Sequence, residues 1–363
     1  MEAPVLLGRE RSDCAGLTYE QDIATHVHTI GGTSARTSGS PNDLGRVTTM
    51  IAAYAEKLGL PDFLDGLVVG EYHDPDPPAG WVVADVKAAS LNPHDTWTLK
   101  GQVGFPFDPP VVLGCDGAGL SPDGKEVVFY PVIPTPDGGL RMLTDGVDGT
   151  FAPKVALPAA NLVPKPANLS FEEAAGLGTA WLTAYRMLFT KAKLRPGERL
   201  LVQGASGGVS TAAIMLAVHA GAHVTVTSRK EQALEKARQL GAHDGVLSGG
   251  KLAKRVDVVI ETVGEATWGH SMKSLNQGGR IVVAGATTGA APSADLNRLF
   301  YREISVLGSA MGTLDEFRTL CAFVEHADLH PPVSEVYDGV DKVPEAMRVL
   351  EAGEQFGKLV IRP

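Results

Sequence analysis

The pattern of hydrophobic positions changes near Pro166, and the change predicts two kinds of structure. Between Met50 and Pro166 the apolar runs are short and are separated by glycine and proline residues. The stretch 81–89 carries apolar residues at every second position, as a half-buried strand does, and 111–114 and 127–132 are short apolar runs. Residues 50–166 are therefore predicted to form a β-rich domain of short strands and many turns.

After Pro166 the period of the pattern lengthens. Ser170 followed by Glu173 is typical of a helix start with a capping box. Short apolar strands then alternate with helical stretches of about ten residues, which predicts βαβ units and a parallel sheet. The strands are expected at 200–202, 223–227, 256–260, 280–284 and 358–361, and the helices at 209–220, 231–240, 267–275 and 343–352.

Residues 1–49 differ from the rest of the chain. They are rich in Gly, Ser and Thr from His26 onward and show almost no apolar periodicity. This composition predicts a flexible extension. A tail that binds a partner is the alternative.

Composition and charge exclude several classes of protein. The chain has 363 residues, 44% of them hydrophobic and 20% charged, which is typical of two or more folded domains. A net charge of −10 without any basic block argues against nucleic acid or an anionic membrane as a partner. Three cysteines, Cys14, Cys115 and Cys321, form neither a disulfide framework nor a four-cysteine zinc site. With no spanning apolar run and no visible signal peptide, a cytoplasmic protein is expected.

The strongest local signal is a glycine-rich turn between an apolar strand and a helix. Gly204 permits a tight turn, Gly207 lets the backbone approach a pyrophosphate, and the following helix offers its N–H groups. Ser210 stands where the usual third glycine would be, and an ordinary strand-to-helix loop is the alternative. The repeated βα units favour a dinucleotide site, with these contacts: Gly204, Ala205, Ser206, Gly207, Gly208 and Val209.

The next predicted strand ends in a cationic turn, Ser228-Arg229-Lys230. A site for NAD usually places an acidic residue there to bind the ribose 2′-hydroxyl, whereas cations suit a 2′-phosphate. The sequence therefore favours NADP(H) as the cofactor over NAD(H). A solvated helix start is the alternative, although basic residues oppose the dipole at a helix N-terminus.

Six ordered motifs extend this picture over most of the chain. They are KAASLNPHD (87–95), LGCDGAG (113–119), DGTFA (148–152), GTAWLTAY (178–185), GGRIVVAG (278–285) and GKLV (357–360). With them the chain resembles the medium-chain dehydrogenase/reductase superfamily, zinc-independent quinone oxidoreductase-like branch, from about Met50 to Pro363. Pro153 stands where the family usually has Glu.

The resemblance implies an α/β fold with two domains and an active site between them. A β-rich GroES-like catalytic domain would span 50–166, a Rossmann-type doubly wound parallel sheet 167–315, and a C-terminal return to the catalytic domain 316–363. The Pro/Gly-rich loop 133–149 is expected to cover the cleft. Beyond the glycine turn, the resemblance implies these cofactor contacts: Val263, Gly285, Ala286, Ser309, Met311 and Lys358.

The metal ligands of related zinc enzymes are replaced in this chain. The resemblance places Asn92, the pair Cys115-Asp116, and Thr179 at the ligand positions. Asn and Thr are poor zinc ligands, so no metal is predicted. An unusual site built from Cys115, Asp116 and His94 is the alternative, and a buried structural role is favoured for Cys115.

Without a Lewis acid, the chemistry that remains is hydride transfer to an electron-poor acceptor, a quinone or an α,β-unsaturated carbonyl. The candidate catalytic residues are Asn92, Asp95 and Trp97. Asn92 suits either a hydrogen bond to the acceptor carbonyl or cofactor ribose, or a turn cap. Asp95 suits loop orientation better than proton donation, and Trp97 suits packing better than stacking on a substrate.

Two departures from the family leave the substrate open. Trp97 stands where quinone oxidoreductases often have Tyr, and Val103 where enoyl-thioester reductases have one. The competing functions are an alcohol dehydrogenase with an atypical zinc site, and a non-catalytic structural protein that binds NADPH.

The segment Glu303–Ser309 is expected to be an edge strand of the parallel sheet. Ile304, Val306 and Leu307 would leave apolar side chains and unpaired backbone groups in water. Pairing with the same strand of a second copy satisfies both, so a homodimer is predicted. An edge covered by the same chain is the alternative.

Overall fold

The computed structural model describes residues 48–103, 107–135 and 139–363. Nearly all of the predicted N-terminal extension, 1–49, lies outside these residues. The first strand, β1, covers Thr49–Ala55, so the β-rich part begins one residue earlier than the sequence suggested.

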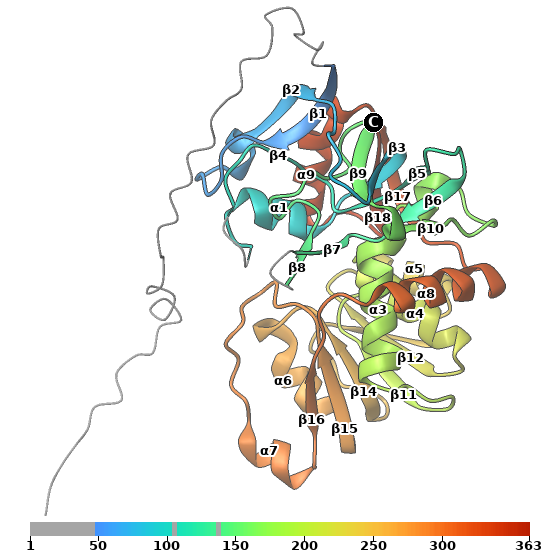
Figure 1. The fold of residues 1–363 in the computed structure, drawn as a ribbon. Helices are drawn as coiled ribbons and strands as arrows, with labels where there is room; N and C mark the ends of the chain where they lie inside the picture. Colours follow the sequence, from blue (N-terminus) through green and yellow to red (C-terminus); the bar gives the residue numbers. More distant parts are fainter. Residues whose placement is uncertain (1–47, 104–106, 136–138) are drawn as a thin grey trace, which may run out of the picture. The chain divides into compact units, whose positions relative to one another are not determined.

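The β-rich part contains two main sheets and a short hairpin (Figure 1). One sheet has the order β2-β1-β4, and the other β10-β6-β5-β3-β18-β17 with β9 also paired to β3. The strands are β2 (Leu67–His73), β3 (Trp81–Ser90), β4 (Val111–Val112), β5 (Asp116–Leu120), β6 (Glu126–Phe129), β9 (Lys154–Pro158), β10 (Leu162–Pro164), β17 (Val333–Asp338) and β18 (Lys358–Arg362). The hairpin pairs β7 (Val132–Pro134) with β8 (Leu140–Met142).

Small residues let neighbouring strands of this part approach closely. Gly119 of β5 faces β3 so closely that an added Cβ would stand 1.8 Å from the carbonyl oxygen of Asp85. The alternating residues of β3 direct Ala84, Val86 and Ala88 into the interior. The predicted β-rich domain is therefore confirmed.

A separate six-stranded parallel sheet has the order β13-β12-β11-β14-β15-β16. Its strands are β11 (Arg199–Val202), β12 (His223–Ser228), β13 (Asp244–Leu247), β14 (Val256–Glu261), β15 (Leu275–Val283) and β16 (Ser305–Gly308). The chain order reverses direction between β11 and β14, which is the position where such sheets bind ligands. The predicted Rossmann-type sheet is confirmed.

Helices α4 (Gly208–His219), α5 (Glu231–Gln239), α6 (Glu265–Ser274) and α7 (Leu296–Tyr301) connect these strands. Two differences from the sequence prediction concern strands. The sequence pattern does not predict β13, because its Asp-Gly-Val-Leu sequence carries no apolar run. Strand β15 begins at Leu275, where a helix end was expected.

The segment after Pro166 is helical and lies between the two sheets in the sequence. The capping box at Ser170 begins α2 (Phe171–Ala174), and π-helical turns at Leu177–Trp181 and Arg186–Lys191 flank α3 (Leu182–Tyr185). Helix α8 (Leu314–His326) shares the apolar core of this helical segment and the parallel sheet.

The C-terminal return differs from its predicted start at residue 316. The chain rejoins the β-rich sheet only at β17, which begins at Val333, and then forms α9 (Val343–Ala352) and β18 (Figure 1). Apolar residues of α9 belong to the core of the β-rich part. The short elements that complete the fold are α1 (Pro93–Leu99) and 3-10 turns at Phe63–Gly66, Ala159–Asn161 and Val340–Lys342.

Among the described residues, the search for a helix long and apolar enough to cross a membrane found none.

Candidate functional site

The glycine-rich turn has the geometry that a pyrophosphate requires. Gly204 follows β11 with φ 84°, a left-handed conformation that favours glycine. Its N–H donates to the Thr227 hydroxyl over 3.2 Å, which fixes the turn against β12. Gly207 caps α4 and no side chain caps the first turn, so the N–H groups of that turn remain for a ligand.

Glycine is also required where α4 begins. A Cβ on Gly208 would stand 2.9 Å from Cδ of Lys358 and 3.0 Å from Cβ of Ala180. The N–H of Gly357 donates to the carbonyl oxygen of Ser206 over 2.8 Å, which ties the C-terminal segment to the turn. The residues present therefore fit a dinucleotide: an open helix N-terminus at the switch point of the sheet, with glycine where the chain is crowded.

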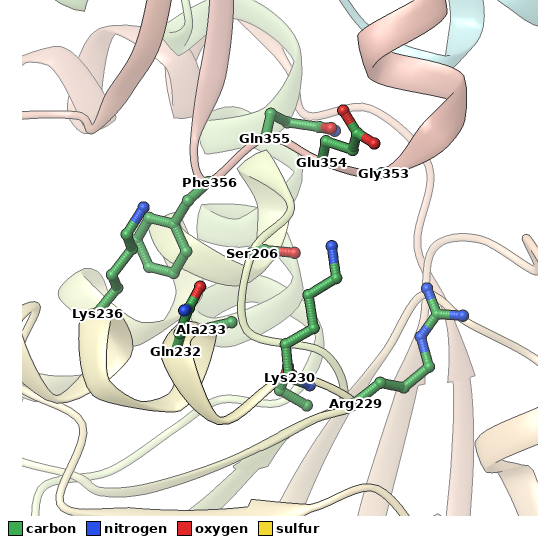
Figure 2. A pocket seen from close by; sticks show the side chains of 11 residues that line it. Ser206, Arg229, Lys230, Gln232, Ala233, Lys236, Gly353, Glu354, Gln355 and Phe356 are labelled. Atoms are coloured by element: carbon green, nitrogen blue, oxygen red, sulfur yellow. Dashed lines mark hydrogen bonds between the residues drawn. The ribbon is translucent and has the colours of Figure 1, made fainter.

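A cationic pocket lies beside this turn (Figure 2). Ser228, Arg229 and Lys230 line it, as predicted for the cofactor, and the Ser228 hydroxyl accepts the N–H of Lys230 over 3.1 Å. Lys236, which was not among the predicted contacts, also lines the pocket, and its ammonium lies 5.4 Å from the ring centre of Phe356. The signal was available, because residues 232, 233 and 236 recur at the spacing of one face of the helix that follows the cationic turn.

Charge in this pocket is mostly positive. Arg229, Lys230 and Lys236 contribute three cations, and Glu354 is the acidic residue among those that line it (Figure 2). Both arginine and lysine form charge-assisted hydrogen bonds to phosphate oxygens. The pocket therefore suits an anionic group next to the dinucleotide turn.

A larger cavity, of about 490 Å³, opens on the other side of the turn. Its size lies in the range of small-molecule and cofactor sites. Residues from both sheets line it, including most of the predicted contacts: Asn92, Trp97, Gly204, Ser206, Gly207, Gly208, Val209, Val263, Gly285, Ser309, Met311 and Lys358. The structure thus brings together residues that the sequence separates by more than 250 positions.

Three predicted residues do not line either pocket: Asp95, Ala205 and Ala286. Ala205 is buried within the glycine turn. Ala286 is exposed and lies beside Gly264, where an added Cβ would stand 3.0 Å from the Cα of Ala286.

Asp95, one of the candidate catalytic residues, contacts backbone groups and does not line the cavity. Its carboxylate is fully buried and accepts the N–H of Asn92 over 2.8 Å and the N–H of Gly114 over 3.1 Å. Burial raises the pKa of Asp95 to about 6, against the lowering effect of the hydrogen bond from Asn92. Because both oxygens bind backbone, Asp95 positions the turn that carries Asn92 and does not face the cavity.

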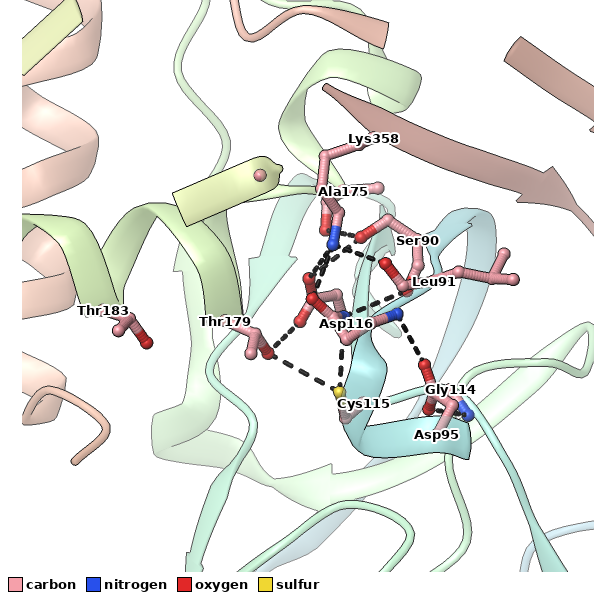
Figure 3. A network of polar contacts seen from close by, with 12 residues as sticks. Ser90, Leu91, Asp95, Gly114, Cys115, Asp116, Ala175, Thr179, Thr183 and Lys358 are labelled. Carbon is pink, nitrogen blue, oxygen red and sulfur yellow. Dashed lines mark hydrogen bonds and ion pairs between the residues drawn. The ribbon is translucent and has the colours of Figure 1, made fainter. Parts of the chain in front are cut away.

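Leu91, Asn92, Thr179 and Lys358 line the cavity and belong to a buried polar network that forms its floor. Figure 3 shows this network. The ammonium of Lys358 donates to the carbonyl oxygen of Leu91 over 2.6 Å and to the amide oxygen of Asn92 over 2.5 Å. Its nitrogen also lies 3.6 Å from the carboxylate of Asp116, which accepts the hydroxyl of Ser90 over 2.9 Å and that of Thr179. The cation and the carboxylate are therefore paired and hydrogen-bonded, as burial requires.

Asn92 is engaged by this network on both sides of its amide. Besides accepting from Lys358, it donates to the carbonyl oxygen of Ser90 over 3.3 Å and to the sulfur of Cys115 over 3.4 Å. Asn92 lines the cavity, and the nitrogen and oxygen of its side-chain amide form the hydrogen bonds of the floor. Asn92 is the N-cap residue of α1, one of the two roles weighed for it, and its side chain borders the cavity.

The four positions that carry metal ligands in related zinc enzymes do not fit a metal ion here. Asn92, Cys115, Asp116 and Thr179 hydrogen-bond one another, and the Lys358 cation approaches Asp116. Burial raises the pKa of the Cys115 thiol well above its usual range, and the carboxylates of Asp95 and Asp116 add to this. Within residues 48–103, 107–135 and 139–363, no three His, Cys, Asp or Glu side chains are grouped to hold a metal.

His94 was weighed in the sequence only as a metal ligand, and its placement is different. It lines the cavity together with Trp97 and Met142, and its Nε2 lies 3.0 Å from a carboxylate oxygen of Asp145. Met142 and Asp145 come from the predicted covering loop 133–149, which in its described part reaches the cavity. No sequence motif pointed to this pair.

Comparison with known proteins places this site in context. A family model described as zinc-binding dehydrogenase matches residues 208–326. A zinc-type alcohol dehydrogenase-like protein of Schizosaccharomyces pombe is 34% identical over 316 residues, covering 78% of this chain and 91% of the relative.

Two further relatives carry names from reductive chemistry. An acryloyl-coenzyme A reductase of Metallosphaera sedula is 30% identical, covering 82% of this chain and 96% of the relative. A quinone oxidoreductase of Mus musculus is 28% identical, covering 79% and 90%. Among solved structures, an NAD-dependent alcohol dehydrogenase superposes with a TM-score of 0.80 at 34% identity, covering 86% of this chain and all of that one.

Proposed function

Because the chain belongs to the medium-chain dehydrogenase/reductase superfamily and is an oxidoreductase of that type, we propose that it is a zinc-independent reductase that uses NADPH to reduce a quinone or an α,β-unsaturated carbonyl. The observation that carries this proposal is the floor of the cavity. Lys358, Asn92 and Asp116 form a closed network where related zinc enzymes hold their metal.

The cationic pocket supports the choice of cofactor. Arg229, Lys230 and Lys236 lie where an adenosine 2′-phosphate would extend from the glycine turn, with no acidic residue at the end of β12 to bind a 2′-hydroxyl. The glycine turn and the first turn of α4 would bind the pyrophosphate, and Ser309 and Met311 would border the nicotinamide. When bound, the reduced nicotinamide supplies a hydride.

The cavity wall supports the choice of substrate class. Trp97, Met142 and Met311 make it mostly apolar beside the nicotinamide position, which suits a flat, electron-poor acceptor. The names of two relatives, a quinone oxidoreductase and an acryloyl-coenzyme A reductase, describe acceptors of this kind.

The test is turnover by the full chain purified without chelator. We expect oxidation of NADPH with at least one member of a panel of quinones and enones, unchanged by a chelator and with no stoichiometric metal. Binding of NADPH without turnover of any panel member would instead indicate a non-catalytic protein.

An alcohol dehydrogenase is the second candidate, favoured by the name of the solved structure at 34% identity. Metal analysis separates the two functions. One tightly bound zinc per subunit, lost together with activity on alcohols, would replace our proposal.

We also propose a homodimer formed through β16. Among the described strands β16 pairs with β15 alone, and Val306 is 43% exposed. Ile304, expected in water, is instead buried against the sheet, which corrects one part of the sequence argument. The neighbouring helix α7 adds exposed Phe300 and Tyr301, so an apolar surface and an open strand edge lie together.

A further inference from the structure

The reduction of an enone or quinone needs a proton as well as a hydride, and the floor of the cavity does not provide an obvious donor. Lys358 is bound to Leu91 and Asn92, and Asp95 faces away from the cavity. The remaining titratable side chain of the described cavity lining is His94.

His94 is held at the start of α1. Asn92 caps this helix and Pro93 follows it, so the imidazole extends from the first turn of a fixed element. Its side chain is 17% exposed and lines the cavity with Trp97. The ring is therefore close to a ligand and sheltered from bulk solvent.

Asp145 fixes the orientation of this ring. One carboxylate oxygen lies 3.0 Å from Nε2 of His94, and the other accepts the N–H of Met142 over 3.3 Å. Asp145 itself is 6% exposed. Both oxygens are thus committed, and the imidazole has one well-defined partner.

The turn that carries Asp145 is tied to α1. Thr144 adopts φ 79°, a costly conformation for a β-branched residue, and its N–H donates to the carbonyl oxygen of Val147 over 2.7 Å. Its hydroxyl lies 3.3 Å from that of Thr98 on α1. The structure therefore holds the turn against the helix and keeps Asp145 beside His94.

The second ring nitrogen has a different environment. An N–H on Nε2 donates to Asp145, which leaves Nδ1 for another partner. Among the described residues none forms a hydrogen bond with Nδ1 of His94. An imidazole with one nitrogen on a buried carboxylate and the other without a protein partner, at a ligand cavity, has the arrangement of a general acid.

We propose that His94, oriented by Asp145, is the catalytic acid that completes the reduction. This inference rests on the proposed function and names its proton donor. Hydride addition at the β-carbon leaves an electron pair at the α-carbon or on the carbonyl oxygen of the substrate. The N–H bond at Nδ1 breaks as a C–H or O–H bond forms there, and solvent returns a proton to the imidazole.

The charges around His94 favour the protonated form that this step needs. Burial alone lowers the pKa of His94, but the hydrogen bond and charge of Asp145 raise it, with further help from Asp95 and Asp116, and the net effect is a raised pKa. Of the cations next to these carboxylates, Lys358 is paired with Asp116, and Arg141 donates to the backbone carbonyl of Asp145. The acid form therefore persists above the usual pKa of about 6.5 for histidine.

The experiment compares three variants of the full chain. His94→Gln keeps a polar side chain that does not titrate, Asp145→Asn keeps the shape of the partner without its charge, and His223→Gln is the matched control. His223 forms a similar pair with Asp244 over 2.8 Å, and neither residue lines the cavity.

With an enone that the unmodified protein reduces, we expect His94→Gln to lower kcat about 100-fold or more while the Kd for NADPH changes by less than about twofold. The fall of kcat at alkaline pH should disappear in His94→Gln and should begin at lower pH in Asp145→Asn. His223→Gln should match the unmodified protein in each respect.

Two readouts do not depend on rate. In the protein without cofactor, NMR titration of the imidazole should give a raised pKa for His94 that falls in Asp145→Asn. In deuterated water with an α-substituted enone, deuterium should enter one face of the α-carbon, and His94→Gln should lose this selectivity.

The outcomes separate the two proposals. If the unmodified protein reduces enones but His94→Gln keeps its kcat, pH profile and facial selectivity, the assignment of His94 is wrong and the proposed function stands. If the unmodified protein binds NADPH but reduces no member of the panel, the proposed function is wrong and the assignment is overturned with it.

Discussion

The ammonium of Lys358 donates to the amide oxygen of Asn92 over 2.5 Å, joining residues 266 positions apart. Lys358 is the first residue of β18, and Asn92 caps α1. One buried cation thus connects the C-terminal strand to the turn that borders the ligand cavity. The position of α1, and of His94 on it, depends on this connection.

Removal of this cation should destabilise the protein. Lys358→Met leaves the oxygens of Leu91 and Asn92 without their donor and Asp116 without its counter-charge. Loss of one partner from a buried pair costs about 3–5 kcal/mol. We expect a decrease of this order in the free energy of unfolding, measured by urea denaturation, together with weaker NADPH binding.

Lys342→Met is the control for that measurement. Lys342 is about half exposed and lies 3.8 Å from Glu345, a surface pair worth about 0–1 kcal/mol. Equal stability of Lys358→Met and Lys342→Met would show that the buried network does not support the fold.

The preference for NADPH should depend on the cationic pocket. We expect NADPH to bind at least about tenfold more tightly than NADH, since each charge-assisted bond to phosphate contributes about 1.5–3 kcal/mol. Arg229→Ala with Lys230→Ala should reduce this ratio, and Lys236→Ala should reduce it further. The affinity for NADH should change little, and both affinities can be measured by calorimetry.

A cation elsewhere provides the control for cofactor choice. Arg318 on α8 pairs with Asp315 over 3.0 Å and lines neither pocket, so Arg318→Ala should keep the ratio. Equal affinity of the unmodified protein for the two cofactors would contradict the NADPH assignment.

Residues 1–46 should be dispensable for folding and reduction. The described chain begins at residue 48, where the carbonyl oxygen of Thr48 accepts the N–H of Asp74 over 3.0 Å, so a deletion must stop before this contact. We expect the Tm and NADPH affinity of the deleted chain to stay nearly unchanged. Deletion through Ala55 removes β1 from its sheet and should lower the Tm sharply. A large effect of the shorter deletion would show that the N-terminal segment contributes to the body of the protein.

Light scattering should give twice the chain mass of 38.1 kDa. Val306→Asp places a charge on the open edge of β16 and should shift the mass to that of a monomer. Leu247→Asp is the matched control, because Leu247 is exposed on β13 at the opposite edge of the same sheet. A monomer at all micromolar concentrations, or dissociation by the control alone, would rule out this interface.

The sequence predicts the fold well because local patterns determine most of it. Apolar strands alternate with helices from β11 to β15, and the glycine turn has one structural solution between β11 and α4. The sequence pattern does not predict β13, because this strand is held by its pairing with β12 and has no apolar run of its own. The sequence also does not predict that the C-terminal return to the β-rich part starts late. Helix α8 first packs on the helical core, and the chain turns back only after it.

The site is less predictable because it depends on contacts between distant residues. His94 and Asp145 are 51 positions apart, and each lies in an ordinary local pattern. The packing of the turn at Thr144 against α1 brings them together. Lys236 is different, since its helical spacing from Gln232 and Ala233, directly after the cationic turn, was sufficient to find it.

The place of β18 between β3 and β17 has a consequence for the order of folding during synthesis. Leu91 leaves the ribosome 267 residues before Lys358, so the end of β3 at Ala89 and Ser90, which pairs with β18, stays open on that side while the parallel sheet, β11 to β16, is already complete in sequence. Domains usually fold in the order of their synthesis. Here the earlier half finishes last, and until β18 arrives the nascent chain presents an open strand edge that chaperones would need to shield.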